Sequence, residues 1–397
     1  MVKISQRALD LPASPIRKLI PYANQAKARG IKIYHLNIGQ PDIASPELFL
    51  QKIKQFPDKV VAYEQSDGNA KLRKSASIYY KRNNIDLEAE EIIITQGGSE
   101  ALWMACFILL ESEQECLTIE PFYANYLSFA NLANVKITAV TSTIENNFQL
   151  PSITKIKAAV TSKTKAILLC SPSNPTGVVY SKKDLQKLVD FCLQKNIFII
   201  SDETYREFFY EKLMPTSLIT FKKAHQNTVI VDSFSKRFSL CGARLGIIAS
   251  KNKDIMAAVL KMAQARLAAP AIEQYAASFL DKVPQSYFAK VQKEYKKRRD
   301  TLVTGLQKIP GVVCGYPAGA FYLIAQLPVD DSEKFARFLL EDFAFKGETV
   351  MVAPAQGFYS TPNLGKKQVR IAYVLNCEDL KKACLLLGKA LEEYNKK

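Results

Sequence analysis

Hydrophobic and polar positions follow two distinct patterns through the middle of the chain, between residues 90 and 250. Short runs that are almost entirely apolar are separated by longer stretches in which apolar residues recur with helical spacing. The apolar runs predict strands at residues 91–95, 115–120, 165–171, 197–203, 228–233 and 243–250. Strands that are apolar throughout are buried on both faces, so this pattern predicts a mostly parallel sheet flanked by helices.

The helical stretches between these strands have recognisable boundaries. Residues 181–195 predict a helix with Ser181 as its N-cap and Asp184 three residues later. Another helix is predicted to begin near Ser99, directly after the first strand. Its apolar run, 101–110, has half the length of a membrane span, so we expect a buried helix and no membrane partner.

The last third of the chain has a different pattern. It predicts a long helix near 284–308, followed by short strands and two more helices, which is typical of a smaller α+β domain. We therefore predict an α/β fold with a large domain at residues 46–285 and a smaller α+β domain at 286–397. The N-terminal segment, residues 1–45, is expected to join the smaller domain.

Composition supports a folded chain and narrows its location. Of its 397 residues, 48% are hydrophobic and 23% are charged, and its opening residues lack the apolar core of a signal peptide. The eight Cys form no C-x-x-C pair, so we expect reduced thiols and a cytoplasmic protein. With only two His, a His-based zinc site is not expected, and we predict no metal.

The net charge of +16 admits two interpretations. One is nucleic-acid binding; the other is an enzyme whose basic surface attracts anionic substrates and cofactors. The strongest basic run, 293–300, lies within a long helical pattern and has no aromatic platform, so it indicates a solvated helix face. No nucleic-acid-binding motif accompanies it, and we predict no nucleic-acid partner.

Candidate chemistry lies where the predicted strands end, because ligands of open α/β sheets bind beyond the carboxyl ends of the strands. Gly98 and Ser99 follow one strand and open a helix, an arrangement that suits a phosphate. When these two residues are considered alone, an ordinary tight strand–helix turn explains them slightly better. Ser233 and Ser235 follow another strand. The pattern predicts that Arg244 begins a further apolar strand, where a buried guanidinium needs an anion.

Other polar groups follow neighbouring strands. Asn174 lies in a stiff loop with two prolines and a glycine, and Asp202 ends a buried strand, with Tyr205 three residues later. A buried carboxylate needs a cation to stay charged, although a helix N-cap is the alternative role for Asp202. Lys236 completes the set, one residue after Ser235.

One small molecule uses all of these groups at one sheet edge, namely pyridoxal 5′-phosphate. Its phosphate requires a cradle, its pyridine nitrogen a carboxylate, and its 3′-oxygen hydrogen-bond donors. Its aldehyde requires a lysine whose pKa is lowered, so that the uncharged amine can form a Schiff base.

With these motifs in order, the chain resembles the aspartate aminotransferase family, the class I/II pyridoxal-phosphate-dependent aminotransferases of fold type I. The resemblance spans nearly the whole chain and includes LNIGQPD, TQGGSEAL, PFYANY, SPSNPTGVVYS, SDETYREF, SFSKRFSLCGARLG, GAFY and VRIAY. The most specific signal is S-x-S-K followed by G-x-R-x-G. The large domain should then carry the cofactor, and the protein should be a homodimer with shared active sites.

The resemblance also implies roles for individual residues. Lys236 is similar to the Schiff-base lysine, and Asp202 to the partner of the pyridine nitrogen. The remaining cofactor-binding positions are Tyr205 and Asn174 at the 3′-oxygen, Tyr123 stacked on the ring, Gly98, Ser99, Ser233 and Arg244 at the phosphate, and Tyr63 at the phosphate of the partner subunit. The substrate-binding positions are Arg370 at the α-carboxylate, with Asn174 and Gly39 beside it.

Without the family resemblance, three of these residues have simpler interpretations. Arg370 would be a salt-bridged strand arginine, Tyr123 a core residue and Tyr63 a surface tyrosine. The family pattern favours the functional interpretation for each.

The chain departs from the family where the side chain of the substrate is bound. One bacterial branch has a lysine at the position of Ser99, and another uses an arginine of the partner subunit. Arg266 lies near the segment that carries that arginine and is our candidate for the distal carboxylate. Glu100, beside the phosphate cradle, is expected to point away or to pair with a base.

These features predict an aminotransferase that moves the amino group of an L-amino acid, with aspartate as the first choice, to a 2-oxo acid such as 2-oxoglutarate. The alternatives are an aromatic or broad-range aminotransferase and a C–S β-lyase with the same cofactor. A transcription factor with an aminotransferase-like domain is not expected, because the family motifs begin by Asn37.

Overall fold

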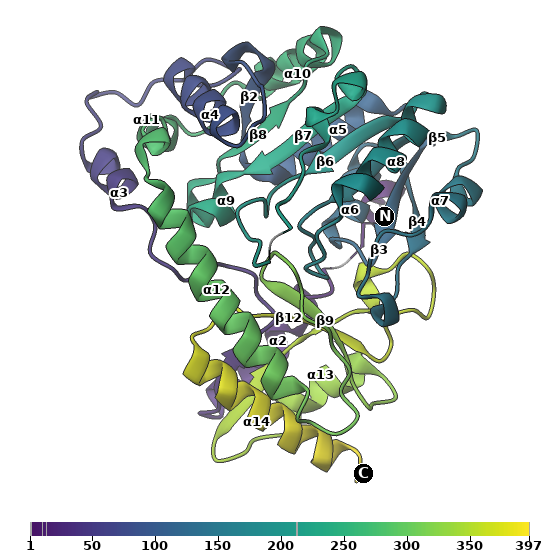
Figure 1. Ribbon diagram of the computed structural model, residues 1–397. Coiled ribbons are helices and arrows are strands. Elements are labelled where there is room, and N and C mark those ends of the chain that lie inside the picture. The colour runs from purple at the N-terminus through teal and green to yellow at the C-terminus, as the bar shows by residue number, and fades with distance from the viewer. Residues whose placement is uncertain (1, 10, 13, 212, 397) are drawn as a thin grey trace.

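A seven-stranded sheet forms the centre of the larger part of the molecule (Figure 1). The structure is a computed structural model and describes residues 2–9, 11, 12, 14–211 and 213–396. The strand order is β2-β8-β7-β6-β5-β3-β4, and only β8 runs against its neighbours, which confirms the mostly parallel sheet. The strands are β2 (Ile92–Thr95), β3 (Glu115–Glu120), β4 (Lys136–Thr141), β5 (Thr164–Cys170), β6 (Phe198–Asp202), β7 (Thr228–Ser233) and β8 (Gly246–Ala249).

Helices cover both faces of this sheet (Figure 1). Because side chains alternate along a strand, Ile93 packs into the core with Met104 of one helix layer, whereas Ile92 and Ile94 pack with Leu72 on the other face. The helices of the larger part are α3 (Glu47–Lys54), α4 (Ala70–Arg82), α5 (Gly97–Leu109), α6 (Asn125–Leu132), α7 (Ile153–Ala159), α8 (Lys182–Gln194), α9 (Phe234–Arg237), α10 (Lys253–Arg266) and α11 (Ala271–Ala277).

A smaller α+β part lies below the sheet in Figure 1, and the long helix α12 runs from one part to the other. Three antiparallel strands and a two-stranded parallel pair form its sheets. Its elements are α12 (Gln285–Leu306), β9 (Tyr322–Gln326), α13 (Ser332–Glu341), β10 (Glu348–Met351), β11 (Ala353–Pro354), β12 (Gln368–Ala372) and α14 (Cys377–Tyr394).

The N-terminal segment packs with the smaller part. After the short α1 (Gln6–Leu9), helix α2 (Ile20–Ala28) contacts α13, and β1 (Lys32–His35) pairs with β10. The chain therefore reaches the sheet of the larger part only after it has crossed the smaller part. The domain boundaries at residues 45/46 and 285/286 remain predictions.

Most predicted elements occur within a few residues of their expected ends. Ser181 is the N-cap of α8, with its hydroxyl accepting from the Asp184 backbone N–H at 3.1 Å. One prediction at the site is wrong, because Arg244 does not begin a strand and is not buried. It follows the short 3-10 helix Cys241–Ala243 with φ of +54°, and β8 starts only at Gly246. A Cβ at Gly246 would lie 2.3 Å from the Gly97 carbonyl carbon, so the backbones approach there as only glycine allows.

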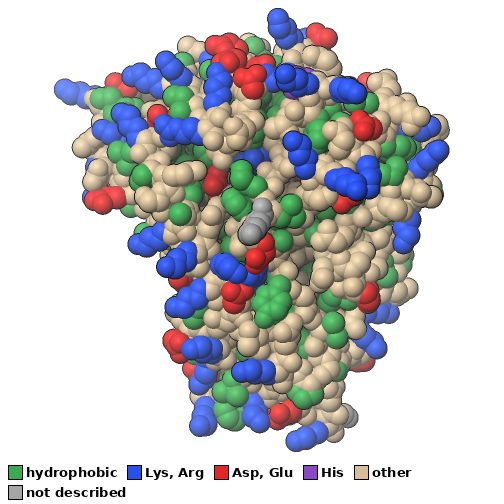
Figure 2. Space-filling view, viewed as in Figure 1, with side chains coloured by type: hydrophobic (Ala, Val, Ile, Leu, Met, Phe, Trp, Pro, Cys, Tyr) green, Lys and Arg blue, Asp and Glu red, His purple; other side chains and the backbone are tan. Residues whose placement is uncertain are grey.

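Basic and acidic side chains are mixed on the visible surface. On the face drawn in Figure 2, Lys and Arg side chains are spread over both parts, with Asp and Glu between them. All eight cysteines are free thiols. Within the described ranges, no helix is both long enough and apolar enough to cross a membrane.

Candidate active site

A pocket of about 500 Å³ opens at the carboxyl ends of β5, β6 and β7, beside the first turn of α5. Most of the residues predicted from the sequence line it together. They are Gly98, Ser99, Tyr123, Asn174, Asp202, Tyr205, Ser233, Ser235, Lys236 and Arg244. The sheet therefore gathers side chains that are separated by as much as 146 residues in the chain, from Gly98 to Arg244.

One end of the pocket is suited to an anion. No side chain caps the start of α5, so the N–H groups of its first turn remain available. Ser233 caps α9, with its hydroxyl 3.1 Å from the Ser235 N–H. A Cβ at Gly97 would lie 2.5 Å from Arg244 Nη2, so a larger residue would displace this guanidinium.

Asp202 ends β6 as a buried carboxylate without a cationic partner among the described residues. It accepts hydrogen bonds from the Tyr126 hydroxyl at 2.6 Å and from the Thr204 hydroxyl at 2.7 Å. Burial raises the pKa of Asp202, and these hydrogen bonds oppose the shift. The Asp202 carboxylate is thus held in place by neutral hydrogen-bond donors, and no described cation pairs with it.

Lys236 lies on the single turn of α9 and is partly buried. Its Nζ donates to the Gly39 carbonyl oxygen at 2.8 Å and lies 3.6 Å from Cys241 Sγ. Burial lowers the pKa of Lys236, and the charges of Arg370 and Arg244 lower it further. A larger fraction of this amine is therefore uncharged and nucleophilic than in an exposed lysine.

Gly39 contributes its backbone because a side chain would not fit. A Cβ there would lie 1.7 Å from the Tyr322 hydroxyl. The Tyr322 hydroxyl in turn lies 3.0 Å from that of Tyr205, and Asn174 Nδ2 lies 3.5 Å from the same Tyr205 oxygen. These groups form a row of polar contacts that begins at the pocket wall, with Asn174 and Tyr205, and continues behind it to Tyr322 and Gly39.

Arg370 is buried on β12 next to these polar groups and has no carboxylate partner among the described residues. It donates to Asn174 Oδ1 at 3.1 Å and to the Asn37 carbonyl at 2.7 Å, while its Nε has no partner. Burial lowers the pKa of Arg370. A buried guanidinium that is bonded only to neutral oxygens is suited to receive an anion.

Tyr123 lies among positive charges. Its hydroxyl accepts from Asn125 Nδ2 at 2.9 Å, and its ring meets that of Tyr126 edge to face at 5.6 Å. Burial raises the pKa of Tyr123, whereas Arg370, Arg17 and Arg244 oppose that shift. The ring is therefore placed where several anionic groups of a ligand can converge.

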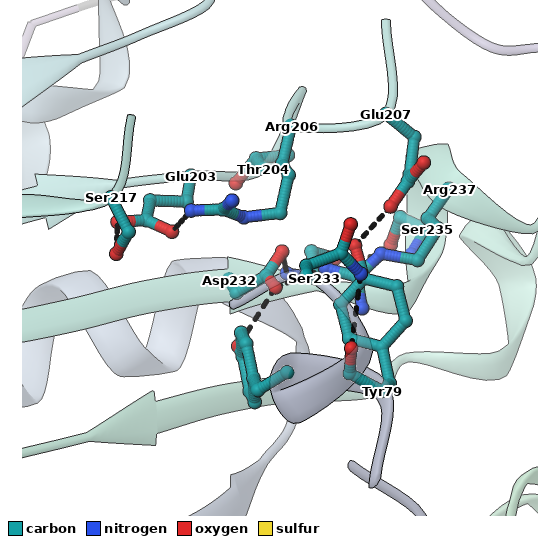
Figure 3. A network of polar contacts seen from close by, with 12 residues as sticks. Tyr79, Glu203, Thr204, Arg206, Glu207, Ser217, Asp232, Ser233, Ser235 and Arg237 are labelled. Carbon is teal, nitrogen blue, oxygen red and sulfur yellow. Dashed lines mark hydrogen bonds and ion pairs between the residues drawn. The ribbon is translucent and has the colours of Figure 1, made fainter. Parts of the chain in front are cut away.

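A second set of buried charges lies next to the pocket where β6 and β7 end, and it contains two ion pairs (Figure 3). Arg237 forms a buried ion pair with Asp232, which also accepts from the Tyr80 hydroxyl at 2.8 Å. Arg206 pairs with Glu203, whose carboxylate accepts from Ser217 at 2.5 Å. These contacts fix the ends of β6 and β7, and hence the positions of Asp202 and Lys236.

Four predicted residues are not among those that line the pocket. Gly39 and Arg370 lie behind it and bond to the lining residues Lys236 and Asn174. Tyr63 and Arg266 lie elsewhere in this subunit. Tyr63 is 82% exposed. Arg266 donates to the carbonyls of Ser66 and Ile94 and pairs with Glu100 at 3.4 Å. The expectation that Glu100 pairs with a base is confirmed, and this pair holds Arg266 away from the cavity.

Sequence patterns alone missed several residues of the site. Tyr126 and Tyr322 lie inside the motifs PFYANY and GAFY, which could have signalled them. Thr204, Cys241 and Arg17 also line the pocket, and Arg17 precedes every family motif. Within the described part of the chain, no group of His, Cys, Asp or Glu has the arrangement of a metal site.

Comparison with known proteins identifies the family to which the chain belongs. The sequence model of the family "Aminotransferase class I and II" matches residues 31–386. An aspartate aminotransferase of Bacillus subtilis (strain 168) is 30% identical over 405 residues, covering 99% of this chain and 100% of that protein. Aromatic-amino-acid aminotransferase 2 of Thermococcus litoralis is also 30% identical, with 98% of both chains covered.

Solved structures agree. The aspartate aminotransferase of Thermotoga maritima superposes with a TM-score of 0.89 at 30% identity, covering 98% of this chain and 100% of that chain. The chain belongs to the aminotransferase class I and II family and has its fold type I architecture. It is an amino-acid aminotransferase.

Proposed function

We propose that this aminotransferase uses pyridoxal 5′-phosphate to move the amino group of an L-amino acid to a 2-oxo acid such as 2-oxoglutarate, with aspartate as the best donor. One observation carries the proposal: Lys236 and Asp202 line the same pocket and form no ion pair with each other. Each lacks the partner that this cofactor would provide.

The residues present fit the cofactor. Asp202 would hold the protonated pyridine nitrogen, and Ser99, Ser233 and Arg244 would hold the phosphate. Tyr205 and Asn174 would donate to the 3′-oxygen, and Tyr123 would cover the ring. The absence of a Cβ at Gly97 leaves the room in which Arg244 lies.

When bound, the cofactor supplies an aldehyde that condenses with amines and a ring that withdraws electrons from the substrate α-carbon. Arg370 would orient the substrate through a two-point contact with its α-carboxylate. Lys236 Nζ is the only amine among the described lining residues, so it would take the proton from the α-carbon and return it elsewhere. The wall of Tyr205, Tyr322 and Asn174 would keep these groups in register.

Aspartate is favoured because several relatives that match the whole chain are named aspartate aminotransferases. The named activity of the Thermococcus litoralis relative supports aromatic donors as a second candidate. A C–S β-lyase would use the same residues, and product analysis separates it from an aminotransferase.

We also propose a homodimer with shared active sites, located in the cytoplasm. Exposed apolar side chains gather in the segment around Tyr63, with Val60 at 73% and Val61 at 59% exposure, as expected of a surface that a second subunit covers. In that dimer Tyr63 would reach the phosphate of the partner subunit. The free thiols support a reducing compartment.

The test uses purified protein supplied with pyridoxal 5′-phosphate. Each amino acid is mixed with 2-oxoglutarate, and the glutamate and new 2-oxo acid are quantified. Equal amounts of both products are expected, and borohydride reduction should attach a pyridoxyl group to the peptide that contains Lys236. Pyruvate and ammonia formed without an acceptor would instead identify the β-lyase.

A further inference from the structure

Arg17 is a pocket residue that the proposed chemistry does not use. It is the first residue of the 3-10 turn η1 (Arg17–Leu19) and lines the cavity together with Tyr123 and Asn125. Its charge acts on the Tyr123 phenol, as do those of Arg370 and Arg244. Three guanidinium charges and the carboxylate of Asp202 thus act on this one phenol.

The charges in and around the pocket do not balance. Arg17, Lys236 and Arg244 line it, Arg370 lies one hydrogen bond behind Asn174, and Asp202 is the only described lining acid. If the proposed function holds, the phosphate neutralises Arg244, the α-carboxylate neutralises Arg370, and Lys236 and Asp202 both act on the cofactor. Arg17 is then the cation that still lacks an anion.

The protein itself does not supply that anion within the described ranges, where no carboxylate forms an ion pair with Arg17. The adjacent Lys18, on the same turn, is paired with Glu333 of the smaller part. The Arg17 side chain is exposed to the pocket mouth, while its backbone is fixed by Leu19, which is only 2% exposed. Because the backbone of Arg17 is held in place and its guanidinium is free, this side chain can bind a small anion at low entropic cost.

The other candidates for the same task are engaged or uncharged. Arg266 does not line the pocket; it forms an ion pair with Glu100 at 3.4 Å, and its Nη2 donates to two backbone carbonyls. Ser99 cannot supply a charge. Among the described residues, the only lining cation without a partner or an assigned role is therefore Arg17.

We propose that Arg17 binds the second carboxylate of a dicarboxylic amino acid and so sets the preference of this enzyme for acidic donors. This inference rests on the proposed function. A guanidinium can engage a carboxylate through two parallel hydrogen bonds, and it loses both with an aromatic or aliphatic donor. Arg17 would then discriminate between substrates without touching the reacting atoms.

The test compares two neighbouring charge removals, Arg17→Gln and Lys18→Gln, in the holoenzyme. With aspartate, Arg17→Gln is expected to lower kcat/KM by about 10- to 100-fold, the usual range for one lost charged hydrogen-bond pair. With phenylalanine, the same variant should change by less than about threefold. Lys18→Gln should leave both substrates within that range, because its side chain binds Glu333 outside the pocket.

A binding measurement supplies a second readout that does not require turnover. Maleate, a dicarboxylate that cannot donate an amino group, is titrated against the holoenzyme, and crotonate serves as the monocarboxylate of similar size. Arg17→Gln should weaken maleate binding by about 10-fold or more and leave crotonate unchanged. Arg17→Lys should recover part of the loss, since it keeps the charge.

The results that overturn the proposal differ from those that overturn the proposed function. Equal losses for aspartate and phenylalanine, or a raised pyridoxal 5′-phosphate concentration for half-reconstitution, would assign Arg17 to the fold or the cofactor. Loss of the aspartate preference in Arg266→Gln but not in Arg17→Gln would transfer the role to Arg266. A wild-type protein that transfers amino groups from phenylalanine but not from aspartate would refute only the role of Arg17. Transfer from no amino acid at all would refute the proposed function.

Discussion

The pocket and the ion-pair network beside it both lie where β6 and β7 end, yet their buried charges are arranged in opposite ways. In the network, Arg237 faces Asp232 and Arg206 faces Glu203 (Figure 3). In the pocket, Asp202 faces only neutral donors, and Arg370 faces only neutral acceptors.

This difference separates structural charges from functional ones. A buried charge costs free energy unless it has a partner, so an unpaired one marks a partner that is a ligand. Removing a network charge should therefore damage stability, and removing a pocket charge should damage activity. The following substitutions test that separation.

The largest effect is expected from Lys236→Ala. The rate of the amino-transfer half-reaction should fall by about 10⁴-fold, because no other described lining residue offers an amine. The ligand-free variant should unfold at the same urea concentration as the wild type or a higher one. A rate within about tenfold of the wild type would exclude Lys236 from the proton transfer.

Arg237→Leu should have the opposite signature. It leaves Asp232 buried without its cation, which is expected to cost about 3–5 kcal/mol of unfolding free energy, measured by urea denaturation. The matched control is Arg337→Ala, which removes an exposed pair with Glu341 and should cost less than about 1 kcal/mol. Similar losses in both variants would mean that the buried network does not determine stability.

Asp202→Asn should lower the half-reaction rate by about 10²–10³-fold, because the amide cannot stabilise a positive ring nitrogen. The loss of a single preorganised electrostatic contact sets that range. Tyr126 and Thr204 can still bond to the amide, so the ligand-free variant should remain folded, as measured by circular dichroism. A variant that fails to fold would place Asp202 with the network.

The smallest effect is a dependence of stability on pH. Burial lowers the pKa of Lys236 in the folded protein below the ordinary value of 10.5, so the unfolded chain binds the proton more tightly between the two pKa values. Lys236→Met removes this cost. Its gain in unfolding free energy over the ligand-free wild type should be largest below the lowered pKa and should shrink as pH rises toward 10.5.

Urea denaturation near neutral pH and at about pH 10 measures this gain. Arg237→Leu is the contrasting variant, because the guanidinium that it removes is charged at both pH values. A gain for Lys236→Met that is independent of pH would show that packing, and not the charge of the amine, causes the difference.

The sequence predicted the sheet and most of the pocket because both depend on local patterns. Continuous apolar runs identified the strands, and polar residues at their ends identified Asp202, Asn174 and Lys236. The prediction that Arg244 begins a strand was wrong. The turn before β8 depends on the contact between Gly97 and Gly246, which lie 149 positions apart (246 − 97).

Sequence patterns could not predict which charged residues form ion pairs with each other. Asp202 and Asp232 both end or nearly end apolar strands, and only the fold determines that Asp232 receives Arg237 while Asp202 receives no cation. Arg266 was a reasonable candidate until Glu100 was found beside it. Arg17 belongs to no periodic pattern, and its place at the pocket follows from the packing of Leu19.

The hydrogen bond from Lys236 Nζ to the Gly39 carbonyl has a consequence for how the ends of the chain are held. It joins the larger part to the N-terminal segment, across 197 positions of the sequence (236 − 39). A lysine chosen for its chemistry therefore also fastens the leading segment. In Lys236→Met, which cannot donate this bond, a protease should cut near Gly39 more readily than in the unaltered protein.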